Sequence, residues 1–156
     1  MILLRNRLAR DERGASIIEM ALLLPFLGSL IIGVADISRA YSAKLKLEQA
    51  AYRSIEKVQQ YRDTSSTFST ISAEATTAAT AAGFTSPVVT VDYFLECDGT
   101  RQATYNATCS GTTTPNRWIT VDIAGTFTPM FASSRWPGSN ANGTYTLHGK
   151  AGLRTQ

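Results

Sequence analysis

An uninterrupted apolar segment, residues 15–35, constrains the fold of this chain more than any other feature of its sequence. The segment holds 21 residues, and Glu19 is the one charged side chain among them. As a helix it would be about 31 Å long, which matches the roughly 30 Å hydrocarbon core of a bilayer. We therefore predict a single transmembrane helix over residues 15–35, behind a leader formed by residues 1–14.

The remaining chain suits one modest folded unit, because 156 residues are too few for two domains that each bury a full core. The net charge is only +3, and the basic side chains are scattered without interleaved aromatic residues. Proteins that bind nucleic acid concentrate basic charge on one face. We therefore expect no nucleic-acid partner, and one domain outside the membrane over residues 63–156.

Helical periodicity continues beyond the apolar segment. Over residues 36–62 apolar side chains recur at steps of three or four, and charged side chains mostly lie between them. This pattern predicts an amphipathic helix that extends the membrane helix. A second short helix is predicted over residues 68–82, where Gly83 can close it and Pro87 ends the helical region.

Three later segments alternate apolar and polar side chains, which is the pattern of strands buried on one face. They are residues 88–95, 118–127 and 144–153. The amphipathic helix can cover the apolar face of the sheet that they would form. The predicted fold class is therefore α+β, with a long N-terminal helix and a short second helix packed on a small antiparallel sheet of about three strands.

The two cysteines, Cys97 and Cys109, enclose a loop rich in Gly, Asn and Thr. Such a pair is typical of a disulfide in an oxidising compartment, and two unpaired thiols are the alternative. Zinc is not expected, because His148 is the only histidine of the chain. We expect no metal and no other cofactor.

Charge counting leaves the orientation of the membrane helix weakly determined, because basic residues flank it on both sides. Those before it are Arg5, Arg7, Arg10 and Arg13, and those just after it are Arg39, Lys44, Lys46 and Arg53. The cysteine pair decides the orientation, since a disulfide places the C-terminal domain outside the reducing cytoplasm. We thus predict a cytoplasmic N-terminus.

A cleavable signal peptide is the alternative to a membrane anchor. Gly33-Val34-Ala35 supplies small residues suitable for cleavage before Asp36. Against this alternative stand the length of the apolar segment, the acid and the proline within it, and the helical pattern that continues through the cleavage position.

A carboxylate inside a bilayer-spanning helix is costly unless it pairs with a cation, reaches the interface or lies against protein. Cleavage after Gly14 would leave a positively charged α-amino group on Ala15, which could neutralise Glu19 within one chain or between neighbours. Alternatively, Glu19 reaches the cytoplasmic interface unaided, since it lies only about four residues inside it.

Residues 14–19, Gly-Ala-Ser-Ile-Ile-Glu, resemble the processing site of type IV pilin-like precursors. In those proteins a prepilin peptidase cuts after a glycine on the cytoplasmic side, and a glutamate is the fifth residue of the mature chain. Residues 12–55 as a whole are similar to the TadE-like (TadE/TadG-like) proteins of tight-adherence pilus systems. The shared features are Arg13-Gly14-Ala15, Glu19-Met20-Ala21, Leu24-Pro25-Phe26-Leu27, Gly33, Arg39-Ala40 and Leu47-Glu48-Gln49-Ala50-Ala51. Met20 departs from the family, in which an aromatic residue commonly follows the glutamate.

The resemblance implies a pilin-like fold and a role as a pseudopilin or minor pilin. Such a protein would be cut between Gly14 and Ala15, would lie in the bacterial inner membrane and would take part in assembling an adhesive pilus. Glu19 would guide the subunit into register with the assembly. The implied partners are the prepilin peptidase, the inner-membrane assembly platform, the major pilin and a TadF-like pilin. The alternatives are a pseudopilin of a type II secretion or competence machine, and a signal-anchored or secreted periplasmic adhesin-like domain.

Three residues of the apolar segment fit a packed membrane helix. Pro25 removes the hydrogen bond to the carbonyl of Ala21 and kinks or loosens the turn. Ser29 and Gly33, four residues apart, let another helix approach closely. A tolerated kink and ordinary small residues are the alternative.

A predicted loop before the last strand contains Met130, Phe131, Arg135 and Trp136. These residue types are favoured at the centres of interfaces. The loop is therefore a candidate partner-binding site, and the alternative is that Phe131 and Trp136 close the open end of the small core.

Catalysis is not expected, because the sequence offers no convergent set of titratable groups. His148 falls on the polar face of the last predicted strand, where it would be solvated. The acids outside the helices are spread over two strands and a loop edge; they are Asp92, Glu96, Asp98 and Asp122. The sequence also contains no phosphate-binding loop, metal-ligand spacing or nucleophile elbow.

Overall fold

The structure is a computed structural model that describes residues 13–60, 67–111 and 114–155. Almost all of the predicted leader lies outside these ranges. The chain divides into two compact units, Met1–Arg39 and Ala40–Gln156. We call them the N-terminal unit and the C-terminal unit.

Helix α2 (Arg13–Gln60) is a single α-helix of 48 residues. It joins the predicted transmembrane helix to the predicted amphipathic helix without a break and passes through Pro25. A proline inside a helix leaves one carbonyl without its intrahelical donor, here that of Ala21. Residues 61–62, the last of the predicted amphipathic helix, lie outside the described residues.

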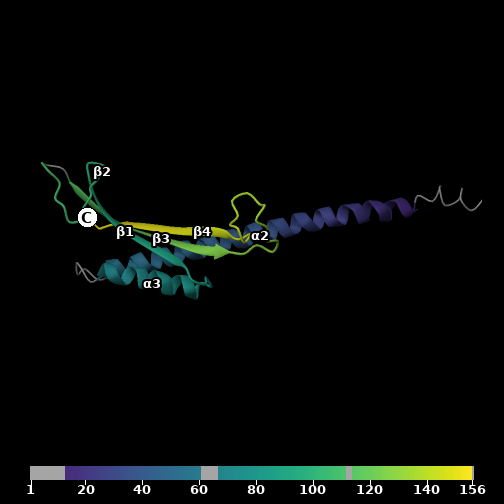
Figure 1. The fold of residues 1–156 in the computed structure, drawn as a ribbon, viewed down its shortest axis with the longest axis horizontal. Helices are drawn as coiled ribbons and strands as arrows, with labels where there is room; N and C mark the ends of the chain where they lie inside the picture. Colours follow the sequence, from purple (N-terminus) through teal and green to yellow (C-terminus); the bar gives the residue numbers. More distant parts are fainter. Residues whose placement is uncertain (1–12, 61–66, 112–113, 156) are drawn as a thin grey trace, which may run out of the picture. The chain divides into compact units, whose positions relative to one another are not determined.

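The C-terminal unit contains an antiparallel sheet of four strands in the order β2-β1-β3-β4 (Figure 1). The strands are β1 (Val88–Cys97), β2 (Thr100–Arg101), β3 (Pro115–Phe127) and β4 (Tyr145–Arg154). The α+β class is confirmed, and the prediction of about three strands misses β2. This two-residue strand follows a tight hairpin turn, in which Asp98 and Gly99 both have a positive φ, of 51° and 75°.

One face of the sheet is apolar, as the alternation of side chains predicts. Its centre is β3, whose Ile119, Val121 and Ile123 are fully buried. The register pairs Val121 with Val91 of β1 on one side and with Ala151 of β4 on the other. The apolar residues of three strands therefore meet on the same face, and the opposite face is mostly polar but also carries Phe94 and Trp118.

Helix α3 (Thr67–Ala81) and the C-terminal part of α2 lie along the apolar face of the sheet (Figure 1). The buried hydrophobic residues of the helices are Leu47, Ala50, Ala51 and Ile55 of α2, and Ile71, Ala75 and Ala79 of α3. The two helices are also joined by an ion pair, in which Lys57 Nζ lies 2.6 Å from Glu74 Oε2. The core of the C-terminal unit is thus one layer between two helices and one sheet face.

Gly83 closes α3 as the sequence predicts. Its φ is 98°, and its amide donates to the carbonyl of Thr80 at 3.0 Å. The next amide, that of Phe84, donates to the carbonyl of Ala79 at 3.1 Å. These two bonds satisfy carbonyls of the last helical turn, and the left-handed conformation that they require favours glycine.

Candidate functional site

The apolar part of α2 is long and hydrophobic enough to cross a membrane. The most hydrophobic window of α2 within Ser16–Lys57 has a mean hydropathy of 2.3, and none of it is buried in the structure. Its exposed side chains include large apolar ones such as Leu22, Phe26 and Ile31. Surfaces of this kind are stable in lipid and not in water, so this segment matches a membrane anchor.

Glu19 is an exposed side chain of this segment, on the same helix as the two residues of the predicted processing site. Among the residues that the structure describes, no hydrogen bond or ion pair involves Glu19. Ala15 lies four residues before it, and positions four apart face the same side of a helix about one turn from each other. In the uncut chain the nitrogen of Ala15 belongs to a peptide bond and carries no charge.

Pro25, Ser29 and Gly33 follow at intervals of four residues, so successive members lie one turn apart along α2. Ser29 Oγ donates to the carbonyl of Phe26 at 2.7 Å, which satisfies its hydroxyl within the helix. Nothing in the structure would touch a Cβ atom added at Gly33. The space around Gly33 is therefore open, and close approach of another helix at this stretch stays a prediction.

In the C-terminal unit α2 has apolar residues on two sides. One side is buried in the core, and the other exposes Tyr41, Leu45 and Tyr52. Tyr41 and Leu45 lie one turn apart and continue the interval of four residues seen in the anchor. A helix that is apolar on its solvent side as well as its core side offers a surface to a further helix.

The predicted partner-binding loop lies on the surface. Phe131 is 62% exposed and Trp136 is 57% exposed, and Met130 and Arg135 are exposed as well. The alternative that Phe131 and Trp136 close the core therefore fails. The core is closed at its edges by Phe84 and by residues of the strands themselves.

The disulfide expected from the cysteine spacing is present in the structure. It joins Cys97, the last residue of β1, to Cys109, and the two Cα atoms are 5.6 Å apart. The bridge closes a segment at the end of the sheet that contains the β1–β2 turn, β2 and the residues after it. An oxidising location of this unit is consistent with such a bridge.

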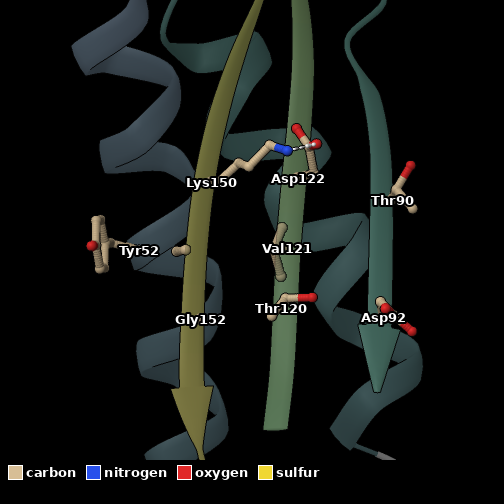
Figure 2. A pocket seen from close by; sticks show the side chains of 9 residues that line it. Tyr52, Thr90, Asp92, Thr120, Val121, Asp122, Lys150 and Gly152 are labelled. Atoms are coloured by element: carbon tan, nitrogen blue, oxygen red, sulfur yellow. Dashed lines mark ion pairs between the residues drawn. The ribbon is translucent and has the colours of Figure 1, made fainter. Parts of the chain in front are cut away.

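The polar face of the sheet holds a shallow, open hollow with a volume of about 490 Å³. Figure 2 shows Thr90 and Asp92 of β1, Thr120 and Asp122 of β3, and Lys150 of β4 around it, with Tyr52 of α2 at its border. The hollow is lined by Thr and paired charged side chains together with Tyr52, Val121, Ala151 and Gly152.

Asp122 is the centre of the charged groups on this face. Its Oδ1 lies 2.9 Å from His148 Nδ1, and its Oδ2 lies 3.1 Å from Lys150 Nζ. Partial burial raises the pKa of Asp122, but the hydrogen bonds and charges of His148 and Lys150 outweigh this effect and hold the pKa below its usual value. The expectation that His148 is merely solvated is therefore incomplete, because it is exposed yet bonded to Asp122.

The other acids considered in the sequence have structural surroundings of their own. Asp92 accepts two hydrogen bonds from Arg101, at 2.9 and 2.8 Å, and Glu96 accepts one from Trp118 Nε1 at 3.0 Å. Within residues 13–60, 67–111 and 114–155, no three potential metal-ligating side chains come together. The pairs on this face can stabilise the sheet, and they do not form a nucleophile with a neighbouring base.

Residues 14–55 match a family model described as TadE-like protein. The match begins at the predicted cleavage glycine and ends at Ile55 in the buried face of α2, so it covers the helix and stops before the sheet. The resemblance predicted from the sequence is confirmed over this segment. Comparisons with curated proteins and with solved structures give no match.

Proposed function

We propose that this chain is a minor pilin or pseudopilin of a tight-adherence pilus system, with no catalytic activity of its own. One observation carries the proposal: the segment that matches the TadE-like family is a single helix that exposes an apolar surface with one acid near its start. Subunits of this class use their N-terminal helix both as an anchor and as the element that packs in the assembly. The match favours this system over a type II secretion or competence machine.

Cleavage between Gly14 and Ala15 is the first step of the proposed function. Hydrolysis of that peptide bond by a prepilin peptidase leaves a protonated amine on Ala15, one helical turn from Glu19 and on the same side of α2. Within the hydrocarbon core a carboxylate is costly unless it reaches the interface or pairs with a cation, and a nearby amine offsets that cost. Glu19 therefore pairs with the amine of its own chain or with that of a neighbouring subunit.

Packing of α2 against other subunits is the second step. Ser29 and Gly33 allow close approach within the bilayer, and Pro25 loosens the turn before them. In the C-terminal unit, exposed Tyr41 and Leu45 offer a further apolar surface to a partner helix. The partners are the major pilin, a TadF-like pilin and the assembly platform.

The proposed location is the bacterial inner membrane, crossed once, with the N-terminus in the cytoplasm and the C-terminal unit in the periplasm. The disulfide between Cys97 and Cys109 supports this orientation, because the cytoplasm is reducing. After assembly the subunit serves a pilus that attaches the cell to surfaces.

Replacement of Glu19 by Gln tests the proposal. E19Q removes the charge and keeps the size of the side chain, so we expect fewer pili and weaker co-purification with partner pilins, at unchanged abundance in the membrane. E56Q is the matched control, since Glu56 is an exposed acid of the same helix outside the apolar segment. Normal pili and normal co-purification with E19Q would contradict the proposed role of Glu19.

A further inference from the structure

In the loop between β3 and β4, residues 128–144, hydrogen bonds join residues 133–144 to one another. Ser139 Oγ donates to the carbonyls of Ser133 and Trp136 at 3.0 and 2.8 Å, and the amide of Asn140 donates to the carbonyl of Thr144 at 2.7 Å. Gly143, with a φ of 72°, packs so closely on the backbone of Ser133 that a Cβ atom would overlap with it. The part of the loop that carries Arg135 and Trp136 is therefore held by these contacts.

The large exposed side chains of the loop are mostly apolar and carry little charge. Met130, Phe131 and Trp136 are each more than half exposed. Arg135 is the only charged residue of the loop, and its guanidinium makes no ion pair with any residue that the structure describes. Exposed Trp and Phe beside a single cation suit the boundary between lipid headgroups and acyl chains.

The direction of β4 relative to α2 shows which end of the C-terminal unit carries the 128–144 loop. Gly149 of β4 lies against Leu47 of α2, and Gly152 of β4 lines the same hollow as Tyr52. Residue numbers thus increase in the same direction along both elements. Tyr145, where β4 begins, lies four residues or about 13 Å before Gly149, and Ala40 lies seven residues or about 10 Å before Leu47.

The loop is therefore at the end of the C-terminal unit where α2 enters it. Figure 1 shows the loop at this end of the sheet, opposite the end that carries β2 and the C-terminus. The predicted membrane span ends at Ala35, only five residues before this unit begins at Ala40. In the sequence, the C-terminal unit therefore begins shortly after the predicted end of the span.

We propose that the 128–144 loop docks into the interfacial region of the membrane that α2 crosses. Met130, Phe131 and Trp136 enter the boundary between headgroups and acyl chains, and Arg135 pairs with lipid phosphate. The sequence predicts that this loop binds a partner, and we infer that the partner is the lipid surface. The proposal rests on the membrane span of the proposed function, and it requires neither cleavage at Gly14 nor entry into a pilus.

Tryptophan fluorescence of the full chain in lipid vesicles tests this proposal. The chain has two tryptophans, Trp136 in the loop and Trp118 in β3, nine residues or about 30 Å before the end of that strand. The variant W118F leaves Trp136 as the reporter, and W136F leaves Trp118 as the matched control. We expect Trp136 emission to shift to shorter wavelength and to be quenched by lipids that carry a nitroxide near the headgroup, while Trp118 emission stays unchanged.

Three further measurements make the outcome decisive. R135Q in the W118F background should weaken quenching in vesicles with anionic lipid more than in purely zwitterionic vesicles. If W118F fails to fold, as judged by circular dichroism, the Trp136 signal is obtained by subtracting the emission spectrum of W136F from that of the wild type. If Trp136 stays unquenched in vesicles, the proposal is overturned. It is also overturned if Trp136 becomes shielded only when partner pilins are added, because the loop would then bind a protein.

Failure of this proposal and failure of the proposed function are distinguishable. Flotation of the chain with the vesicles reports the membrane span independently of the loop. A chain that floats with unquenched Trp136 contradicts only the docking of the loop, whereas a chain that does not float contradicts the anchor itself.

Discussion

Gly149 in β4 lies directly against the main chain of Leu47 in α2. A Cβ atom at position 149 would overlap with the carbonyl carbon and Cβ of Leu47 and with the amide nitrogen of Glu48. The helix therefore rests on the sheet at backbone distance, and the side chain of Leu47 reaches past β4 toward Gly125 of β3. The position of α2 on the sheet depends on these two glycines.

Gly149→Ala should lower the free energy of unfolding of the C-terminal unit by about 1–3 kcal/mol, because the added methyl group forces the helix and the strand apart. Denaturant unfolding in detergent, followed by circular dichroism, measures the change. Gly152→Ala is the control in the same strand, since a Cβ there would meet only Thr120 Cγ2 at 3.4 Å or beyond. Equal stability of G149A and the wild type would mean that this contact is not tight in solution.

Leu47→Ala should cost about 2–5 kcal/mol of stability, because Leu47 is fully buried between the helix and the sheet. Leu45→Ala should cost far less, since Leu45 is 39% exposed on the other side of α2. The two variants separate folding from assembly: L47A lowers the unfolding midpoint, whereas L45A weakens co-purification with partner pilins and leaves the midpoint nearly unchanged. A stability loss for L45A as large as that for L47A contradicts the assignment of the two sides.

Removal of the disulfide should destabilise the C-terminal unit by about 3 kcal/mol, the chain-entropy value for a closed loop of about this size. The double variant C97S/C109S should show the lower unfolding midpoint, and reductant should shift the wild type toward it. Because the double variant has no disulfide left, reductant must leave its midpoint unchanged. The reduced state of both cysteines is verified first. If the unfolding midpoint of the reduced wild type then equals that of the oxidised protein, the disulfide has no stabilising role.

Stability should fall on acidification in a way that depends on Asp122. The pKa of Asp122 in the folded chain is below the usual 3.8, so the folded state binds its proton less readily than the unfolded state does. Its stabilising contribution is therefore complete above the unfolded pKa and is lost as the pH falls through the folded pKa.

The variant D122N isolates this contribution. The difference in unfolding free energy between wild type and D122N should be largest well above pH 3.8 and should shrink as the pH falls below it. D98N serves as the control, because Asp98 lies in the β1–β2 turn, where Asn also tolerates a positive φ. A difference between wild type and D122N that does not change with pH contradicts the charge pairing with His148 and Lys150.

The elements that depend on local pattern could be predicted from the sequence. Periodicity indicated α2 and α3, alternation indicated the three long strands, and Gly83 marked the end of α3. Strand β2 could not be predicted, because two residues are too short to show any alternation. Its only signal is the Asp98-Gly99 pair, a typical hairpin turn sequence.

The parts that depend on tertiary register could not be predicted. The pairing of Asp122 with His148 and Lys150 follows from the alignment of β3 with β4, in which Asp122 lies opposite Lys150. Likewise, composition could not decide whether Trp136 is buried, because an apolar loop residue can either cap a core or face outward. The need for glycine at position 149 arises only from the close crossing of α2.

Mass spectrometry of the mature N-terminus, on protein purified from whole cells and from the culture medium of its native host, tests the pilin-like function most directly. We predict a mature chain that begins at Ala15, with the free amine one turn from Glu19, and a chain that keeps Met1 in cells without the prepilin peptidase. A mature chain that begins at Asp36 indicates secretion by signal-peptide cleavage, and one that begins at Met1 despite an active peptidase indicates a plain anchor. Either of these two results contradicts the pilin-like function.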